Sequence, residues 1–128
     1  MTGEQWHSVV MKFGGTSVGD SSAVRRLQGI VEREQRPRLV VVSALSGVTD
    51  QLFCLAEAAG RGEDNGLRPL VDELHARHRK LASEVVIPAQ ETEIFVKIES
   101  TFDKLTSLAH AVSALHELSP RSADAIAA

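Results

Sequence analysis

Two short apolar segments, each followed by a loop of small residues and then by a helical pattern, constrain the fold most strongly. Residues 8–13 read Ser-Val-Val-Met-Lys-Phe, and residues 39–42 read Leu-Val-Val-Val. Both are short, rich in apolar and β-branched residues, and bounded by turn formers, which is typical of buried strands. The second segment does not alternate apolar with polar residues. We therefore expect a parallel strand covered on both faces.

A helix is expected between these strands. Ser21 or Ser22 can cap it, and Arg36-Pro37 ends it after about Glu34. Its apolar residues have helical spacing: Val24, Leu27, Ile30 and Val31. A strand–helix–strand unit with parallel strands forms a right-handed crossover, so both strands end at the same edge of the sheet. The predicted fold class is α/β, with a parallel βαβ start followed by a helical segment.

The rest of the chain is helical by pattern. A helix is predicted over residues 49–59, with Cys54 in its core face, and residues 60–65 form a loop. Two long amphipathic helices follow, and Ser119-Pro120 begins another. The first long helix carries Leu67, Leu70, Val71, Leu74, Leu81 and Val85. The second carries Ile94, Ile98, Phe102, Leu105, Leu108, Val112 and Leu115.

Composition argues against several classes of protein. The net charge of -3 argues against nucleic acid as the main partner, because such binders usually carry a clear basic excess. The single cysteine excludes an intramolecular disulfide. No apolar run approaches the length needed to span a bilayer, and the N-terminus does not read as a signal peptide. We therefore expect no membrane partner and a cytoplasmic protein.

The loops that follow the two strands carry the candidate site. Gly14 and Gly15 let a ligand approach backbone N–H groups, and the following helix presents its N-terminus, which favours anions. Lys12 at the strand end can offer a cation to phosphate oxygens. Hydroxyl groups gather around the same edge, on Thr16, Ser17, Ser43 and Thr49. The pattern indicates a phosphate-binding pocket, and no metal site formed by side chains is predicted.

A simpler interpretation of the same residues is open. Lys12 could extend into water while the two glycines only form a turn. The loop is neither the Gly-Lys-Ser/Thr phosphate loop nor the Gly-x-Gly-x-x-Gly dinucleotide motif. From the residues alone, a phosphate-binding pocket and a simple turn beside an exposed lysine both remain possible interpretations.

The segment Lys-Phe-Gly-Gly-Thr-Ser-Val, residues 12–18, resembles the N-terminal signature of aspartokinases, within the amino-acid kinase superfamily. Residues 39–49, Leu-Val-Val-Val-Ser-Ala-Leu-Ser-Gly-Val-Thr, resemble the second strand and loop of that family. Residues 119–126 resemble the helix that leads into its Gly-Glu motif. The resemblance implies an amino-acid kinase fold, of which residues 1–128 form the N-terminal, truncated portion of the catalytic domain.

The resemblance implies transfer of the ATP γ-phosphate to the side-chain carboxylate of L-aspartate, the first step of lysine, threonine and methionine biosynthesis. The substrates would be aspartate and ATP with bound Mg²⁺, in a homo-oligomer of the full-length protein. Lys12 would be catalytic and bind the phosphates. Gly14 and Gly15 would bind them through N–H groups, and Phe13 through its backbone. Ser43 would line the junction with aspartate.

Thr49 would hold the aspartate, while Thr16 and Ser17 are secondary candidates. The acceptor-binding Glu of the family would lie just past Ala128, so we expect the isolated chain to be inactive. Two alternatives remain at this point. The protein could be an amino-acid kinase with another acceptor, or a non-catalytic interaction module.

Overall fold

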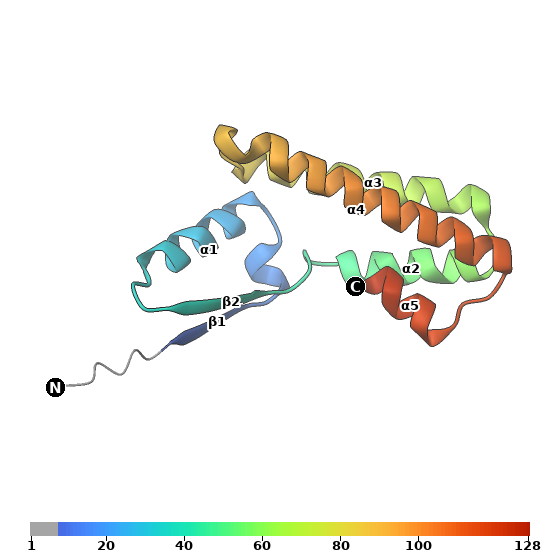
Figure 1. The fold of residues 1–128 in the computed structure, drawn as a ribbon, viewed down its shortest axis with the longest axis horizontal. Helices are drawn as coiled ribbons and strands as arrows, with labels where there is room; N and C mark the ends of the chain where they lie inside the picture. The colour runs from blue at the N-terminus through green and yellow to red at the C-terminus, as the bar shows by residue number, and fades with distance from the viewer. Residues whose placement is uncertain (1–7) are drawn as a thin grey trace. The chain divides into compact units, whose positions relative to one another are not determined.

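The computed structural model describes residues 8–128, which fall into two compact units that divide between Ser46 and Gly47 (Figure 1). Trp6 and His7, which are expected from the sequence to flank the first strand, lie outside the described residues. Among residues 8–128, no helix combines the length and the apolar character needed to cross a membrane.

The first unit is the predicted βαβ crossover. It contains strand β1 (Val9–Phe13), a short 3₁₀ turn η1 (Gly15–Val18), helix α1 (Ser21–Arg33) and strand β2 (Arg38–Val42). The strands pair in parallel, with Lys12 opposite Val41 and Phe13 opposite Val42. Figure 1 shows α1 lying along the pair of strands. The α/β class and the shared edge of the two strand ends are confirmed.

Helix α1 begins one residue earlier than expected. Its N-cap is Asp20, whose Oδ1 accepts a hydrogen bond from Ala23 N at 2.7 Å. The prediction of Ser21 or Ser22 as the cap is therefore wrong, because both residues already lie in the helix. A carboxylate at this position also interacts favourably with the positive end of the helix dipole.

Strand β2 is not covered on both faces, which corrects the prediction. Leu39 is 61% exposed and Val42 is 55% exposed. The described chain forms a sheet of only two strands, and α1 is the only α-helix in this unit. The register places Val10 and Lys12 on the same face as Leu39 and Val41, and all four are exposed. Among residues 8–46, no element covers this apolar sheet face.

The second unit is entirely helical. It contains α2 (Val48–Gly60), α3 (Asp64–Val85), α4 (Pro88–Leu115) and α5 (Pro120–Ala127). Helices α3 and α4 run side by side as a long antiparallel hairpin, and α2 packs against both (Figure 1). The predicted Ser119 cap is confirmed, since its Oγ accepts a hydrogen bond from Ser122 N at 3.1 Å.

The core of this unit joins all four helices. Leu55 of α2 is fully buried, and its cluster includes Leu67 of α3, Ala109 and Val112 of α4, and Ile126 of α5. Small residues at the contacts between helices allow the backbones to approach closely. The core therefore depends on contacts between segments that are far apart in the sequence.

Two predicted core positions of the helical unit are wrong. Cys54 is exposed, because Leu55, Ala56 and Ala59 define the buried face of α2 and Cys54 lies off it. Leu115 is 74% exposed, because it ends α4, just before His116 turns the chain with a left-handed φ of 50°. The helical spacing of the apolar residues in α4 did not show at which residue this apolar face stops being covered by another helix.

A polar cluster links α3 to α4 on the same hairpin. The Glu99 carboxylate of α4 forms an ion pair with Arg79 of α3, and one of its oxygens lies 2.9 Å from His75 Nε2. The Arg79 guanidinium also lies 4.8 Å from the centroid of the Phe95 ring, within the range of a cation–π contact. Burial opposes ionisation of Glu99, but the hydrogen bonds and charges of Arg79 and His75 outweigh it and lower its pKa.

We expect Leu55→Ala to lower the free energy of unfolding by about 3 kcal/mol, because it leaves a cavity in a fully buried site. Leu115→Ala is the matched control in the same unit and should change that free energy by less than about 0.5 kcal/mol. Urea unfolding followed by circular dichroism measures both. Equal losses in the two variants would contradict the core described above.

The Glu99 pair should make stability depend on pH. Its pKa is lowered from 4.5 in the folded state, so its stabilisation is present above that value and is lost as the pH falls through the lowered pKa. Glu99→Gln should therefore be less stable than the wild type at neutral pH, and the difference should shrink in acid. Thermal unfolding across this range measures it, with Asp103→Asn, an exposed carboxylate on α4, as the control. A difference that does not vary with pH would contradict the role of Glu99.

Candidate functional site

The two predicted loops meet at one edge of the sheet. Ser43 N donates a hydrogen bond to Phe13 O at 3.0 Å, which extends the ladder one step beyond β2. A Cβ atom added to Gly15 would lie 3.7 Å from Ser43 Oγ and 3.7 Å from Ser46 Cα. A side chain at position 15 would therefore meet the loop after β2, so the two loops lie next to each other.

Lys12 lies on the exposed face of β1, directly before the glycine turn. Within the described part of the chain, no carboxylate forms an ion pair with its ammonium group. An ammonium group that is neither buried nor paired can offer its charge to an incoming anion without first breaking a contact. Lys12 is thus placed at the edge where Gly14, Gly15 and Ser43 come together.

The glycine turn is a short 3₁₀ element. Ser17 N donates to Gly14 O at 2.9 Å, which closes the turn. Gly14 has φ -81° and ψ 179°, an extended conformation open to any residue, and an added Cβ would find no atom within 4 Å. Neither backbone geometry nor packing therefore requires glycine at position 14, and the space above its backbone is open.

Phe13, Thr16 and Ser17 line a different surface. They border a cavity of about 260 Å³ on the α1 side, together with Arg26 and three apolar residues of α1: Ala23, Leu27 and Ile30. Lys12 is not among the lining residues, because successive side chains of a strand point to opposite faces. The two secondary candidates thus border this cavity rather than the exposed sheet face that carries Lys12.

Arg26 borders this cavity, although its position was not predicted from the sequence. It lies three residues after Ala23 and directly before Leu27, so its stem lies beside the face of α1 that lines the cavity. That spacing was visible in the sequence. The pattern that indicates this position is a cationic residue, Arg26, set among the apolar residues of α1.

The hydroxyl candidates Ser43 and Thr49 belong to different units. Ser43 Oγ donates a hydrogen bond to Ala44 O at 2.8 Å, and this residue is exposed. Thr49 lies in the first turn of α2, in the second unit, and is also exposed. Gly47 precedes it with a left-handed φ of 79° and serves as the N-cap of α2 without a side-chain hydrogen bond.

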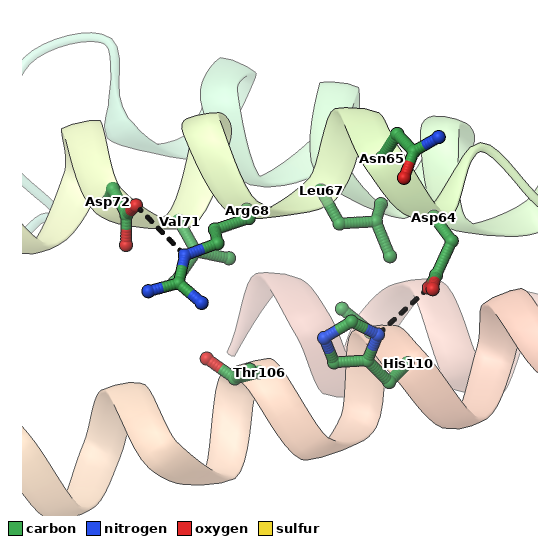
Figure 2. Close-up of a pocket in the computed structure, with 9 residues that line it drawn as sticks. Asp64, Asn65, Leu67, Arg68, Val71, Asp72, Thr106 and His110 are labelled. Carbon is green, nitrogen blue, oxygen red and sulfur yellow. Dashed lines mark hydrogen bonds and ion pairs between the residues drawn. The ribbon is translucent and has the colours of Figure 1, made fainter.

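A groove of about 440 Å³ lies elsewhere, between α3 and α4 (Figure 2). Its floor is apolar, with Leu67, Val71 and Ala109. Its rim charges already have partners: His110 Nδ1 lies 2.9 Å from Asp64 Oδ1, and Arg68 Nε lies 3.6 Å from Asp72 Oδ2. Balanced, exposed pairs give the groove little preference for an anion, so it is a poor phosphate site.

No group of three or more His, Cys, Asp or Glu residues that could hold a metal ion occurs within residues 8–128. The chemistry available at the sheet edge is therefore that of one ammonium group, backbone N–H groups and hydroxyls. These groups suit the binding of phosphate oxygens.

Known proteins of similar sequence are aspartokinases. The aspartokinase of Chlamydia trachomatis is 38% identical over 102 residues, which are 78% of this chain and 22% of that protein. The lysine-sensitive aspartokinase 3 of Escherichia coli is 51% identical over 55 residues, which are 43% of this chain and 12% of that protein. A comparison with models of protein families gave no match.

Solved structures lead to the same family. The R-state crystal structure of E. coli aspartokinase III in complex with aspartate and ADP matches with a TM-score of 0.78 and 32% identity. The match covers 94% of this chain and 25% of that one. Similarity in sequence and in fold agree: this chain resembles aspartokinases, of whose length it spans about a quarter or less.

Proposed function

We propose that this chain supplies the phosphate-binding part of an aspartate kinase, which transfers the γ-phosphate of ATP to the side-chain carboxylate of L-aspartate. One observation carries the proposal most directly. Two loops from paired parallel strands touch each other beside Lys12, whose ammonium group is exposed. In open α/β sheets, ligands bind at this edge, outside the carboxyl ends of the strands.

In this proposal Lys12 stabilises negative charge on the phosphoryl group in transfer. Gly14 and Gly15 donate backbone N–H groups to the phosphates, and Phe13 shapes the floor through its backbone. Ser43 lines the junction between phosphate and acceptor. The open space above Gly14 supports this assignment, because a ligand could reach the backbone there unobstructed.

Thr49 holds the aspartate carboxylate in the same proposal. Its place in the first turn of α2 supports this role, since the N-terminus of a helix favours anions and Gly47 supplies no side-chain cap. Thr16 and Ser17 are weaker candidates, since they line the cavity on the α1 side.

The chemistry needs no general base. An aspartate side chain has an ordinary pKa of about 3.9, so the nucleophile is already ionised at neutral pH. The enzyme must bring two anions into line and offset their repulsion, which a lysine, N–H groups and the Mg²⁺ bound to ATP accomplish. Among the described residues, the sheet edge carries no obvious catalytic His or Asp, which is compatible with this reaction.

The relatives are four or more times longer than their match to this chain. We propose that the reaction also needs segments corresponding to the remainder of those proteins. The 128-residue chain alone should form no aspartyl phosphate, whereas the complete gene product that contains it should. Trapping of the product as a hydroxamate measures both.

Lys12→Ala in the complete protein should reduce kcat about 100-fold, because a preorganised cation worth about 3 kcal/mol in the transition state is lost. Arg26→Ala, near the glycine turn but on the α1 side, is the matched control and should retain most activity. Wild-type turnover in the Lys12 variant would refute the role of this residue. No hydroxamate from the complete wild-type protein, with aspartate or with other acceptors, would refute the kinase itself.

Gly14→Ala should weaken ATP binding without changing the stability of the fold. The added methyl meets no protein atom and the backbone conformation is ordinary, so the melting temperature should not change. The methyl would, however, occupy the space assigned to the nucleotide, and we expect the KM for ATP to rise about tenfold or more. Gly47→Ala is the opposite control: its left-handed φ of 79° should cost stability, by about 1 kcal/mol. An unchanged KM for ATP in Gly14→Ala would remove Gly14 from the site.

A further inference from the structure

Gly19 has no conformational reason to be glycine. It follows η1 with φ -71° and ψ -33°, a right-handed helical conformation that any L-residue adopts. Its surroundings differ from those of Gly14. A Cβ at position 19 would lie 3.6 Å from Gly15 O, 3.7 Å from Thr16 O and 3.8 Å from Ser46 Cβ. These are ordinary van der Waals distances for one methyl, and Ser46 is the neighbour from the other loop that a larger side chain would meet.

Ser46 occupies the other side of the same contact. Its Cβ faces Gly19, and its Cα lies 3.7 Å from the place where a Cβ on Gly15 would be. Ser43, at the start of this loop, is itself tied to the neighbouring backbone by its bond to Ala44 O. Residue 46, in the loop after β2, therefore lies next to two glycine positions of the loop after β1.

We propose that the Gly19–Ser46 contact is a positioning contact, which sets the distance between the glycine turn and Ser43. The inference rests on the proposed function, because that distance matters only if the turn binds phosphate and Ser43 lines the acceptor junction. Neither Gly19 nor Ser46 is assigned to ATP or aspartate. Gly19 is half-buried and Ser46 is exposed, so the loop after β2 can move outward when a side chain larger than a methyl is added at position 19.

The expected consequence is catalytic. A displacement of about 1 Å between groups that align two reactants can reduce a rate about 100-fold. Binding of ATP needs mainly the glycine turn and Lys12, whereas transfer also needs Ser43 at the correct separation. A disturbed contact should therefore lower kcat more than it raises the KM for ATP.

The contact itself can be tested in the 128-residue chain by NMR. A nuclear Overhauser effect between Gly19 Hα and Ser46 Hβ is expected, and its absence would overturn the inference. Gly19→Val should shift the amide signals of Gly15 and Ser43 while leaving that of Leu55 in the second unit unchanged. If Gly19→Val does not fold, Ser46→Val adds volume from the opposite side and should shift the same two amides. Unchanged signals in the folded variant would also overturn the inference.

The catalytic role is tested in the complete protein by the hydroxamate assay. Gly19→Val should lower kcat about 10- to 100-fold and change the KM for ATP by less than about threefold. Gly19→Ala is the matched control, because its methyl stays at ordinary contact distance, and it should remain close to the wild type. If Gly19→Val does not fold, Ser46→Val should show the same split.

A compensating substitution at Ser46 distinguishes a positioning role of the contact from a general loss of structure. Ser46→Gly removes the Cβ that faces position 19, so alone it should have little effect. Combined with Gly19→Val, it should restore kcat by at least about fivefold. A loss that Ser46→Gly does not relieve, or an unchanged kcat in Gly19→Val, would overturn the positioning role. Inactivity of the wild type would instead refute the proposed kinase, while the NMR result would still decide whether the contact exists.

Discussion

The candidate site depends on the parallel pairing of β1 with β2. The pairing brings Phe13 opposite Val42, and the next step of the ladder, from Ser43 N to Phe13 O, draws the two loops together. An antiparallel pair would put these loops at opposite ends. Parallel pairing requires a crossover between the strands, which α1 supplies, and Asp20 fixes where that helix begins. The cap of one helix and the alignment of two strands therefore determine which residues meet.

The glycines of the first loop serve different physical purposes. Gly15 and Gly19 lack side chains where a second loop lies against them, whereas Gly14 lacks one where no protein atom is near. Gly47, at the boundary of the two units, has a left-handed backbone that other residues adopt at a cost. A methyl at position 15 or 19 would meet the second loop at ordinary contact distance, the backbone of Gly47 favours glycine, and the proposed function assigns Gly14 to the nucleotide.

The two units differ in how well they bury their apolar residues. The helical unit has a core to which all four of its helices contribute. The first unit leaves Val10, Leu39 and Val41 exposed on one sheet face. A parallel sheet ordinarily has both faces covered, and the aspartokinases that resemble this chain are much longer than it. Similarity to those proteins, together with the position of Lys12 on this face, favours the proposed kinase over the alternative of an interaction module.

The sequence by itself determined the order of the elements, the class of the fold, the parallel crossover and the resemblance to aspartokinases. These follow from local patterns: apolar runs, turn residues, caps and the segment from Lys12 to Val18. The tertiary structure alone decided that Asp20 caps α1, that Cys54 and Leu115 are exposed, and that Ser46 rests on Gly15 and Gly19. Spacing along a chain specifies which residues share a face, but not whether another segment covers that face. Contacts between loops depend on distances that only the folded chain creates.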